Sequence, residues 1–161
     1  MASRRKGRIL AFQTLYAWET SHRSLGEALD FSWIEEEKQK TLGEELFAFS
    51  RLLVTGTIEH IKAVDRTIRS HILHWDFSRV NRVDLAVLRM STYALMYQQD
   101  VSPSIIINEA IGISKEFGTD DSYRFVNGVL DSIRKTLHNH TPEELTHGFS
   151  CPESAIKTDA P

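Results

Sequence analysis

The chain has 161 residues, one cysteine and a formal net charge of −3. This length suits a single domain with its own core. The acidic balance excludes a protein that coats nucleic acid over its whole surface, so a nucleic-acid site would have to be a local patch. Because Cys151 is the only cysteine and no apolar run reaches the ~20 residues of a membrane span, we expect a cytoplasmic protein.

The first predicted helix covers residues 3–21 and begins with a cluster of cations. These are Arg4, Arg5, Lys6 and Arg8. Cations at a helix N-terminus oppose the helix dipole, so helix stability does not account for them. At ~100° per residue, Phe12 and Tyr16 lie on nearly the same side as Arg5. The pattern suits solvated charges at a chain end or, alternatively, a site that binds phosphates and stacks bases on aromatic rings.

Two capping boxes predict the starts of the next helices. Residues 24–27 (Ser-Leu-Gly-Glu) open a helix to about residue 37, with Trp33 on its buried face. Residues 41–44 (Thr-Leu-Gly-Glu) open another, whose apolar pattern continues to residue 72. This is long for one globular helix, so we expect a break near residues 62–66.

Three more helices are predicted, over residues 81–99, 103–117 and about 119–137. Gly118 is expected to end the second of these in a left-handed conformation, and Thr119 or Asp120 to cap the third. No repeat or domain boundary interrupts residues 1–137. Residues 138–161 have no periodicity, which predicts a flexible tail. The expected architecture is all-α, a single domain of six or seven helices.

The last predicted helix has two different faces at 3.6 residues per turn. Its apolar stripe, the expected contact with the core, consists of Val126, Val129, Leu130, Ile133 and Leu137. Asp121, Phe125 and Gly128 fall on another face. A large aromatic beside a carboxylate and a glycine is unusual if packing is its only role, and Gly128 indicates a place where another backbone comes close.

The sequence contains no convincing catalytic or metal-binding motif. A Gly-rich phosphate loop, a Cys-x-x-Cys pair and a Gly-x-Ser-x-Gly elbow are all missing. His71 and His74 have the spacing of helical metal ligands but no obvious third ligand, so we interpret them as packing or surface histidines. Residues 138–140 (His-Asn-His) match a nuclease motif by letter only. We predict no cofactor, no metal and no enzymatic activity.

Three segments resemble the NusB family of bacterial transcription antitermination factors. They are RRKGRILAFQTLY (residues 4–16), RVDLAVLRMSTYAL (82–95) and NEAIGISKEFGTDDSYRFVNGVLD (108–131). The resemblance covers about residues 3–137 and implies a pair of small helical bundles without enzymatic activity. It also implies binding to the single-stranded boxA element of ribosomal RNA operon transcripts together with NusE, a small ribosomal-subunit protein. The pair would join RNA polymerase complexes that resist termination.

The resemblance further implies roles for particular residues. The RNA-contacting positions of the family match Arg4, Arg5, Lys6, Arg8, Gln13, Tyr16, Phe117, Asp121 and Phe125. The NusE-facing surface corresponds to Ser78, Asn81 and Asp84. An acidic surface there would suit a basic ribosomal protein. Gly7 stands where the family commonly has alanine, and it is expected to loosen the first turn.

Two other functions remain open. Some ribosomal RNA cytosine methyltransferases carry a NusB-like domain at their N-terminus, which would make this chain the RNA-binding module of an enzyme. Only about 24 residues follow Leu137, and they contain no cofactor-binding pattern. The chain could also be a helical adaptor that binds protein alone, with incidental arginines. RNA binding by a variant without those arginines would separate the adaptor from an RNA-binding protein.

Overall fold

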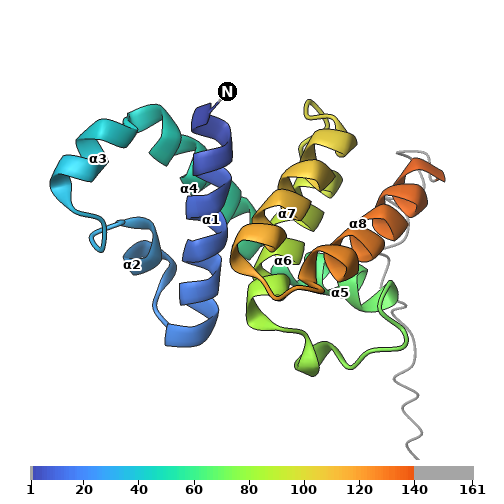
Figure 1. Cartoon of the computed structure of the whole chain (residues 1–161). Coiled ribbons are helices and arrows are strands. Elements are labelled where there is room, and N and C mark those ends of the chain that lie inside the picture. Colours follow the sequence, from blue (N-terminus) through green and yellow to red (C-terminus); the bar gives the residue numbers. More distant parts are fainter. Residues whose placement is uncertain (1, 140–161) are drawn as a thin grey trace, which may run out of the picture.

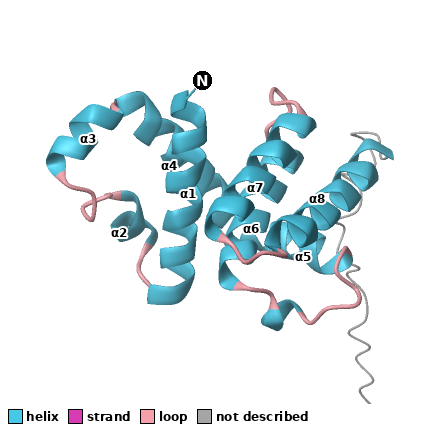
Figure 2. Cartoon of the chain, in the orientation of Figure 1, coloured by secondary structure: helices cyan, strands magenta, loops and turns pink. Residues whose placement is uncertain are grey.

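A computed structural model shows an all-helical protein and describes residues 2–139, confirming the predicted all-α class (Figures 1 and 2). The described part contains eight α-helices and one 3₁₀ turn. In chain order they are α1 (Ala2–Ser21), α2 (Leu25–Leu29), α3 (Glu36–Leu42), α4 (Glu44–Glu59), α5 (Ile61–Ser70), the 3₁₀ turn η1 (Phe77–Arg79), α6 (Arg82–Tyr97), α7 (Pro103–Phe117) and α8 (Ser122–Asn139). None of these helices is long and apolar enough to cross a membrane.

The predicted tail is only partly within the described residues. His138 and Asn139 continue α8, so the helix extends two residues beyond the predicted end. Residues 140–161 lie outside the described part of the chain, and the expectation of flexibility there stays a prediction.

Helices α1 and α6 join the two halves of the molecule, α1–α4 and α5–α8. Helix α1 packs on α2 and α4 in its own half and on α6 in the other, while α6 also contacts α4, α5, α7 and α8. Figure 1 shows α1 standing between α2 and α3 on one side and α7 and α8 on the other. The predicted stripe of the last helix is buried in this shared core at Val126, Val129, Leu130 and Ile133.

A buried arginine fastens three helices together. Arg89 on α6 donates two hydrogen bonds to the carboxylate of Asp65 on α5 and one to Glu19 on α1, each 2.9 Å long. Burial alone would lower the pKa of Arg89, but the bonds to both carboxylates outweigh it and raise that pKa. The cation is therefore firmly held at the junction of the two halves.

The predicted helix over residues 24–37 is correct at its start and wrong after Leu29. The capping box is confirmed. The Ser24 hydroxyl accepts from the Glu27 backbone N–H, and the Glu27 carboxylate accepts from the Ser24 backbone N–H. The chain then turns, with Phe31 at φ +52°. The Phe31 ring is buried against Phe47, with 5.2 Å between ring centroids. This burial competes with helix continuation and leaves Trp33 exposed, contrary to the prediction.

Two further predicted boundaries are wrong. Thr41 lies inside α3, where its hydroxyl donates to a carbonyl one turn earlier, and α4 starts after Gly43 at φ +82° without a side-chain cap. The long pattern breaks at His60 rather than at residues 62–66. The His60 ring is hydrogen-bonded to the Gly56 carbonyl at 2.9 Å and contacts the ring of Tyr97, which fixes the residue at the junction of α4 and α5.

Candidate nucleic-acid interface

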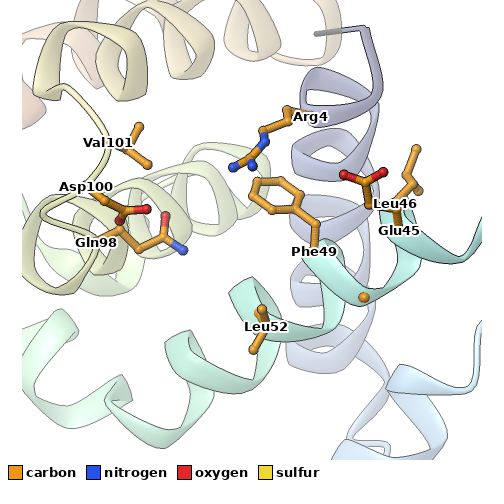
Figure 3. Close-up of a pocket in the computed structure, with 9 residues that line it drawn as sticks. Arg4, Glu45, Leu46, Phe49, Leu52, Gln98, Asp100 and Val101 are labelled. Atoms are coloured by element: carbon orange, nitrogen blue, oxygen red, sulfur yellow. The ribbon is translucent and has the colours of Figure 1, made fainter.

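The N-terminal cations of α1 point in different directions. The guanidinium carbons of Arg4 and Arg8 lie 5.2 and 5.5 Å from the ring centroid of Phe49 on α4, and Figure 3 shows Arg4 above this ring. Arg8 is only 9% exposed. Burial lowers the pKa of its guanidinium, and the negative charge of Glu109 offsets part of this effect by raising that pKa. Arg4 is exposed. Of the two, Arg4 is the one within reach of a phosphate in solution.

Gly7 allows α4 to approach α1 closely. A Cβ at Gly7 would stand 2.6 Å from Cδ1 of Phe49, and the Gly7 carbonyl accepts a hydrogen bond of 2.8 Å from the Ser50 hydroxyl. The Phe49 ring, on which Arg4 and Arg8 lie, can therefore pack against α1 at Gly7 only because this position lacks a side chain.

Arg5 lies across α7. Its Nη1 is 3.6 Å from Oε2 of Glu109 and its Nη2 is 3.5 Å from Oε2 of Glu116. A Cβ at Gly112 would stand 2.7 Å from Arg5 Nη1, so this glycine makes room for the guanidinium. Long ion pairs between partly exposed side chains contribute little stability. An incoming phosphate can therefore replace one of these carboxylates.

Phe12 and Phe117 connect the same two helices. Their ring centroids are 5.0 Å apart, with the rings tilted by 55°. Phe12 is buried, whereas Phe117 is 37% exposed and Tyr16, one turn along α1, is 39% exposed. The α7 end thus places an aromatic ring next to the basic helix. The sequence alone could not establish this adjacency.

The junction between α7 and α8 is a tight turn. Gly118 is extended (φ −90°, ψ −171°), so the predicted left-handed conformation is wrong. A Cβ at Gly118 would stand 2.6 Å from the Ser122 side chain, whose hydroxyl accepts from the backbone of Thr119 at 2.9 Å. Helix α8 starts at Ser122, later than the predicted caps Thr119 and Asp120 imply. Asp121 therefore sits exposed immediately before α8.

Phe125 has a different neighbourhood from Phe117. It is half-buried and makes a T-shaped contact with the exposed Trp75 ring, with centroids 5.9 Å apart. The two rings line a hollow of about 250 Å³ between the segment after α5 and the exposed face of α8, which includes Arg124 and Gly128. A Cβ at Gly128 would meet nothing within 4 Å, so no described part of this chain approaches the α8 backbone there, and the approach of another molecule stays a prediction.

Lys6 and Gln13 lie on the other flank of α1. They line a hollow of about 480 Å³ together with Trp33 and Lys38 from the segment between α2 and α3. Sequence reasoning missed Trp33, Lys38 and Phe49 as neighbours of the basic helix. No local signal could have found them, because each comes from another element of the fold.

The residues matched to a protein partner lie at and before the start of α6. The Asn81 carboxamide caps α6 by accepting from the Val83 backbone at 2.9 Å, and the Ser78 hydroxyl donates to Asp76 at 2.8 Å. Asp84 is only 6% exposed. Burial raises the pKa of its carboxyl, and a hydrogen bond with the Ser122 hydroxyl offsets part of this effect by lowering that pKa. Ser78 and Asn81 are accessible to a partner, whereas the Asp84 carboxylate is largely covered, so the structure does not bear out an exposed acid there.

His71 is explained by packing. Its Nδ1 is hydrogen-bonded to the Thr67 carbonyl at 2.8 Å and its Nε2 to the Thr136 hydroxyl at 2.9 Å. Within residues 2–139 there is no group of three or more His, Cys, Asp or Glu side chains that could hold a metal ion.

Comparisons with known proteins agree with this architecture. The model of the NusB family matches residues 5–135. The transcription antitermination protein NusB of Treponema denticola is 50% identical over 131 residues, covering 81% of this chain and 95% of that protein. NusB of Treponema pallidum is 46% identical over 133 residues, covering 83% and 93%.

Solved structures show the same fold. T. maritima NusB superposes with a TM-score of 0.75 at 32% identity, covering 88% of this chain and 94% of that one. The crystal structure of antitermination factors NusB and NusE in complex with dsRNA matches with a TM-score of 0.71 at 24% identity, covering 84% and 98%. Because the family model spans most of the chain and the relatives are up to 50% identical in sequence, the chain belongs to the NusB family.

Proposed function

We propose that this chain binds single-stranded boxA-type RNA of ribosomal RNA operon transcripts together with NusE, and so helps RNA polymerase to resist termination. Its relatives are named transcription antitermination proteins, and one structural neighbour combines NusB, NusE and dsRNA. The observation that carries the proposal is the exposed Phe117 ring, which packs on the buried Phe12 of α1. The same helix carries Arg5, which is paired with Glu116, and the exposed Tyr16. Exposed rings beside cations suit unstacked bases, which a single strand offers.

The residues at this surface have different roles in binding. Arg4, Arg5 and Lys6 attract phosphates, whereas Arg8 is buried and packs against Phe49. Tyr16, Phe117 and Phe125 supply faces on which bases stack, and Gln13 can hydrogen-bond to a base edge. Asp121 would repel a phosphate, so its carboxylate is suited to accept from a base amino or imino group.

The partner surface lies at the start of α6. Ser78 and Asn81 are exposed there, and Asp84 lies behind them as a covered carboxylate. A chain with net charge −3 and few free cations at the RNA surface should bind RNA weakly alone. A basic ribosomal protein would extend the positive surface and give cooperative binding. The role is regulatory, non-enzymatic and located in the cytoplasm, where transcripts are made.

The test is a titration of labelled boxA RNA, with and without NusE. The variant Arg4→Gln/Arg5→Gln/Lys6→Gln is expected to bind more weakly, with a salt slope smaller by about 2, since each single-strand phosphate contact contributes ~0.7. Arg23→Gln/Lys40→Gln/Lys62→Gln removes the same charge from exposed positions elsewhere and serves as the control. Equal losses in both variants would contradict a local site. Equal RNA affinity with and without NusE would refute the cooperativity.

A further inference from the structure

Trp33 is exposed although both of its near neighbours in the turn are buried. Phe31 and Ile34 are 1% and 8% exposed and belong to a small apolar cluster with Phe47, whereas 51% of Trp33 is accessible. A large aromatic ring at this level of exposure contributes little to the core. Trp33 is not among the residues assigned to RNA or to NusE, so neither role explains its exposure.

Three hydrogen bonds define the turn that carries Trp33. The Ser32 backbone donates to the Asp30 carboxylate at 2.9 Å, and the Gln39 carboxamide donates to the carbonyls of Phe31 and Ile34 at 3.2 and 2.8 Å. Phe31 adopts φ +52°, a conformation that side chains other than glycine rarely take. In the folded protein this backbone conformation and these bonds hold the Trp33 side chain outside the apolar cluster.

The surroundings of Trp33 have the chemistry of a nucleotide site. The hollow of about 480 Å³ brings it together with Lys6 and Gln13 of α1 and Lys38 of α3. Both lysines are exposed, and neither is among the ion-paired residues of the described part of the chain. The hollow therefore offers an aromatic face, two ammonium groups and an amide over an apolar floor. Glu35 is the one acid that lines it, so the local charge is positive on a protein that is acidic overall.

The hollow lies next to the proposed RNA surface, on the neighbouring side of α1. Lys6 and Gln13 form its α1 wall, and at ~100° per residue they lie about 60–100° around the helix from Arg5 and Tyr16. Figure 1 shows α1 between α7 and the α2–α3 segment, so an RNA strand that crosses α1 from α7 would reach the segment that carries Trp33.

We propose that the Trp33 hollow binds one further nucleotide of the same single-stranded RNA, with its base on the Trp33 ring and its phosphate between Lys6 and Lys38. This inference rests on the proposed function and extends the RNA path over α1 to the segment between α2 and α3. Base stacking on an aromatic ring is sequence-tolerant. The hollow thus adds affinity and length to the bound RNA rather than base specificity.

The experiment measures binding of a boxA-type RNA to the full chain in the presence of NusE. Trp33→Leu should weaken binding at least about 5-fold, and Trp33→Phe, which keeps an aromatic face, should restore most of it. Lys38→Gln should lower the salt slope by about 0.7, whereas Lys40→Gln, an exposed lysine on the same helix that does not line the hollow, should leave it unchanged. Thermal melting checks that each variant is folded.

The outcomes separate the two proposals. If Trp33→Leu and Lys38→Gln bind RNA like the wild type while the Arg4/Arg5/Lys6 variant is impaired, the hollow is not part of the RNA path and the proposed function stands. Loss of NusE binding by Trp33→Leu with unchanged RNA affinity would assign the hollow to protein and overturn the inference. Failure of the wild-type chain to bind RNA would overturn the proposed function and this extension together.

Discussion

The buried ring of Phe12 on α1 supports the exposed ring of Phe117 at the end of α7, with 5.0 Å between their centroids. The contact links two helices that are about a hundred residues apart in sequence. It fixes an aromatic face beside Arg5, whose guanidinium also lies on α7. The candidate RNA surface is therefore assembled from both halves of the molecule.

The two rings should respond differently to truncation. Phe117→Ala is expected to weaken RNA binding by about 1–3 kcal/mol through loss of a stacking face, with a modest loss of stability. Phe12→Ala leaves a cavity in the core and should lower the free energy of unfolding by about 3–5 kcal/mol. Urea denaturation and RNA titration of both variants check the pair. Unchanged RNA affinity in Phe117→Ala would remove this ring from the site.

Arg4 and Arg8 should separate RNA binding from stability. Arg4 is exposed, so Arg4→Gln is expected to lower the salt slope of RNA binding by about 0.7 while stability changes little. Arg8 is buried against Phe49, so Arg8→Gln is expected to lower stability and leave the slope unchanged. The measurements are RNA titrations at several salt concentrations and chemical denaturation. A slope that falls equally in both variants would show that Arg8 reaches RNA.

The buried Arg89 should matter more for stability than the exposed Arg82, although both contact Glu19. Arg89→Met leaves Asp65 and Glu19 without their shared cation and is expected to cost about 3–5 kcal/mol. Arg82→Met removes one exposed contact of 3.7 Å and should cost less than about 1 kcal/mol. Urea denaturation measures both. Similar small effects would mean that the three-helix junction does not depend on Arg89.

Asp84 should make stability depend on pH in an unusual direction. Because burial raises its pKa in the folded state, the native protein takes up a proton more readily than the unfolded chain. The contribution of this group to the free energy of unfolding therefore rises as pH falls from the folded pKa toward ~3.9. Asp84→Asn is expected to raise stability at pH 7, and the difference should shrink as pH falls from the raised folded pKa toward ~3.9, where the carboxyl is protonated in both states.

The control for this comparison is Asp100→Asn, at an exposed position in the loop after α6. It should change stability by less than about 0.5 kcal/mol. Denaturation curves between pH 3 and pH 8 compare the two variants with the wild type. A loss of stability at pH 7 in Asp84→Asn would mean that the carboxylate accepts bonds that outweigh its burial.

Local patterns predicted the features that depend on neighbours in sequence. The Ser24 capping box and the buried stripe of α8 both follow from spacing alone. The break after Leu29 could not be predicted, because it depends on Phe31 packing against Phe47 from another helix.

The candidate site shows the same limit. The sequence identified the basic turn and the aromatic residues of α1 and α7, but a projection of α1 alone could not reveal that Phe49 covers Arg8. It also could not show that Phe125 meets Trp75 while Phe117 meets Phe12. These pairings arise only when distant elements pack together.

The small apolar cluster under the α2–α3 segment divides the molecule into parts of unequal stability. It contains Leu10, Phe31, Ile34, Leu46 and Phe47, apart from the main core. Helices α2 and α3 have five and seven residues, too few to persist without that contact. This segment can therefore unfold locally while α6 and α8 stay intact, and its amides should exchange with solvent at a lower opening free energy. Ligand binding at that side of α1 would slow the exchange.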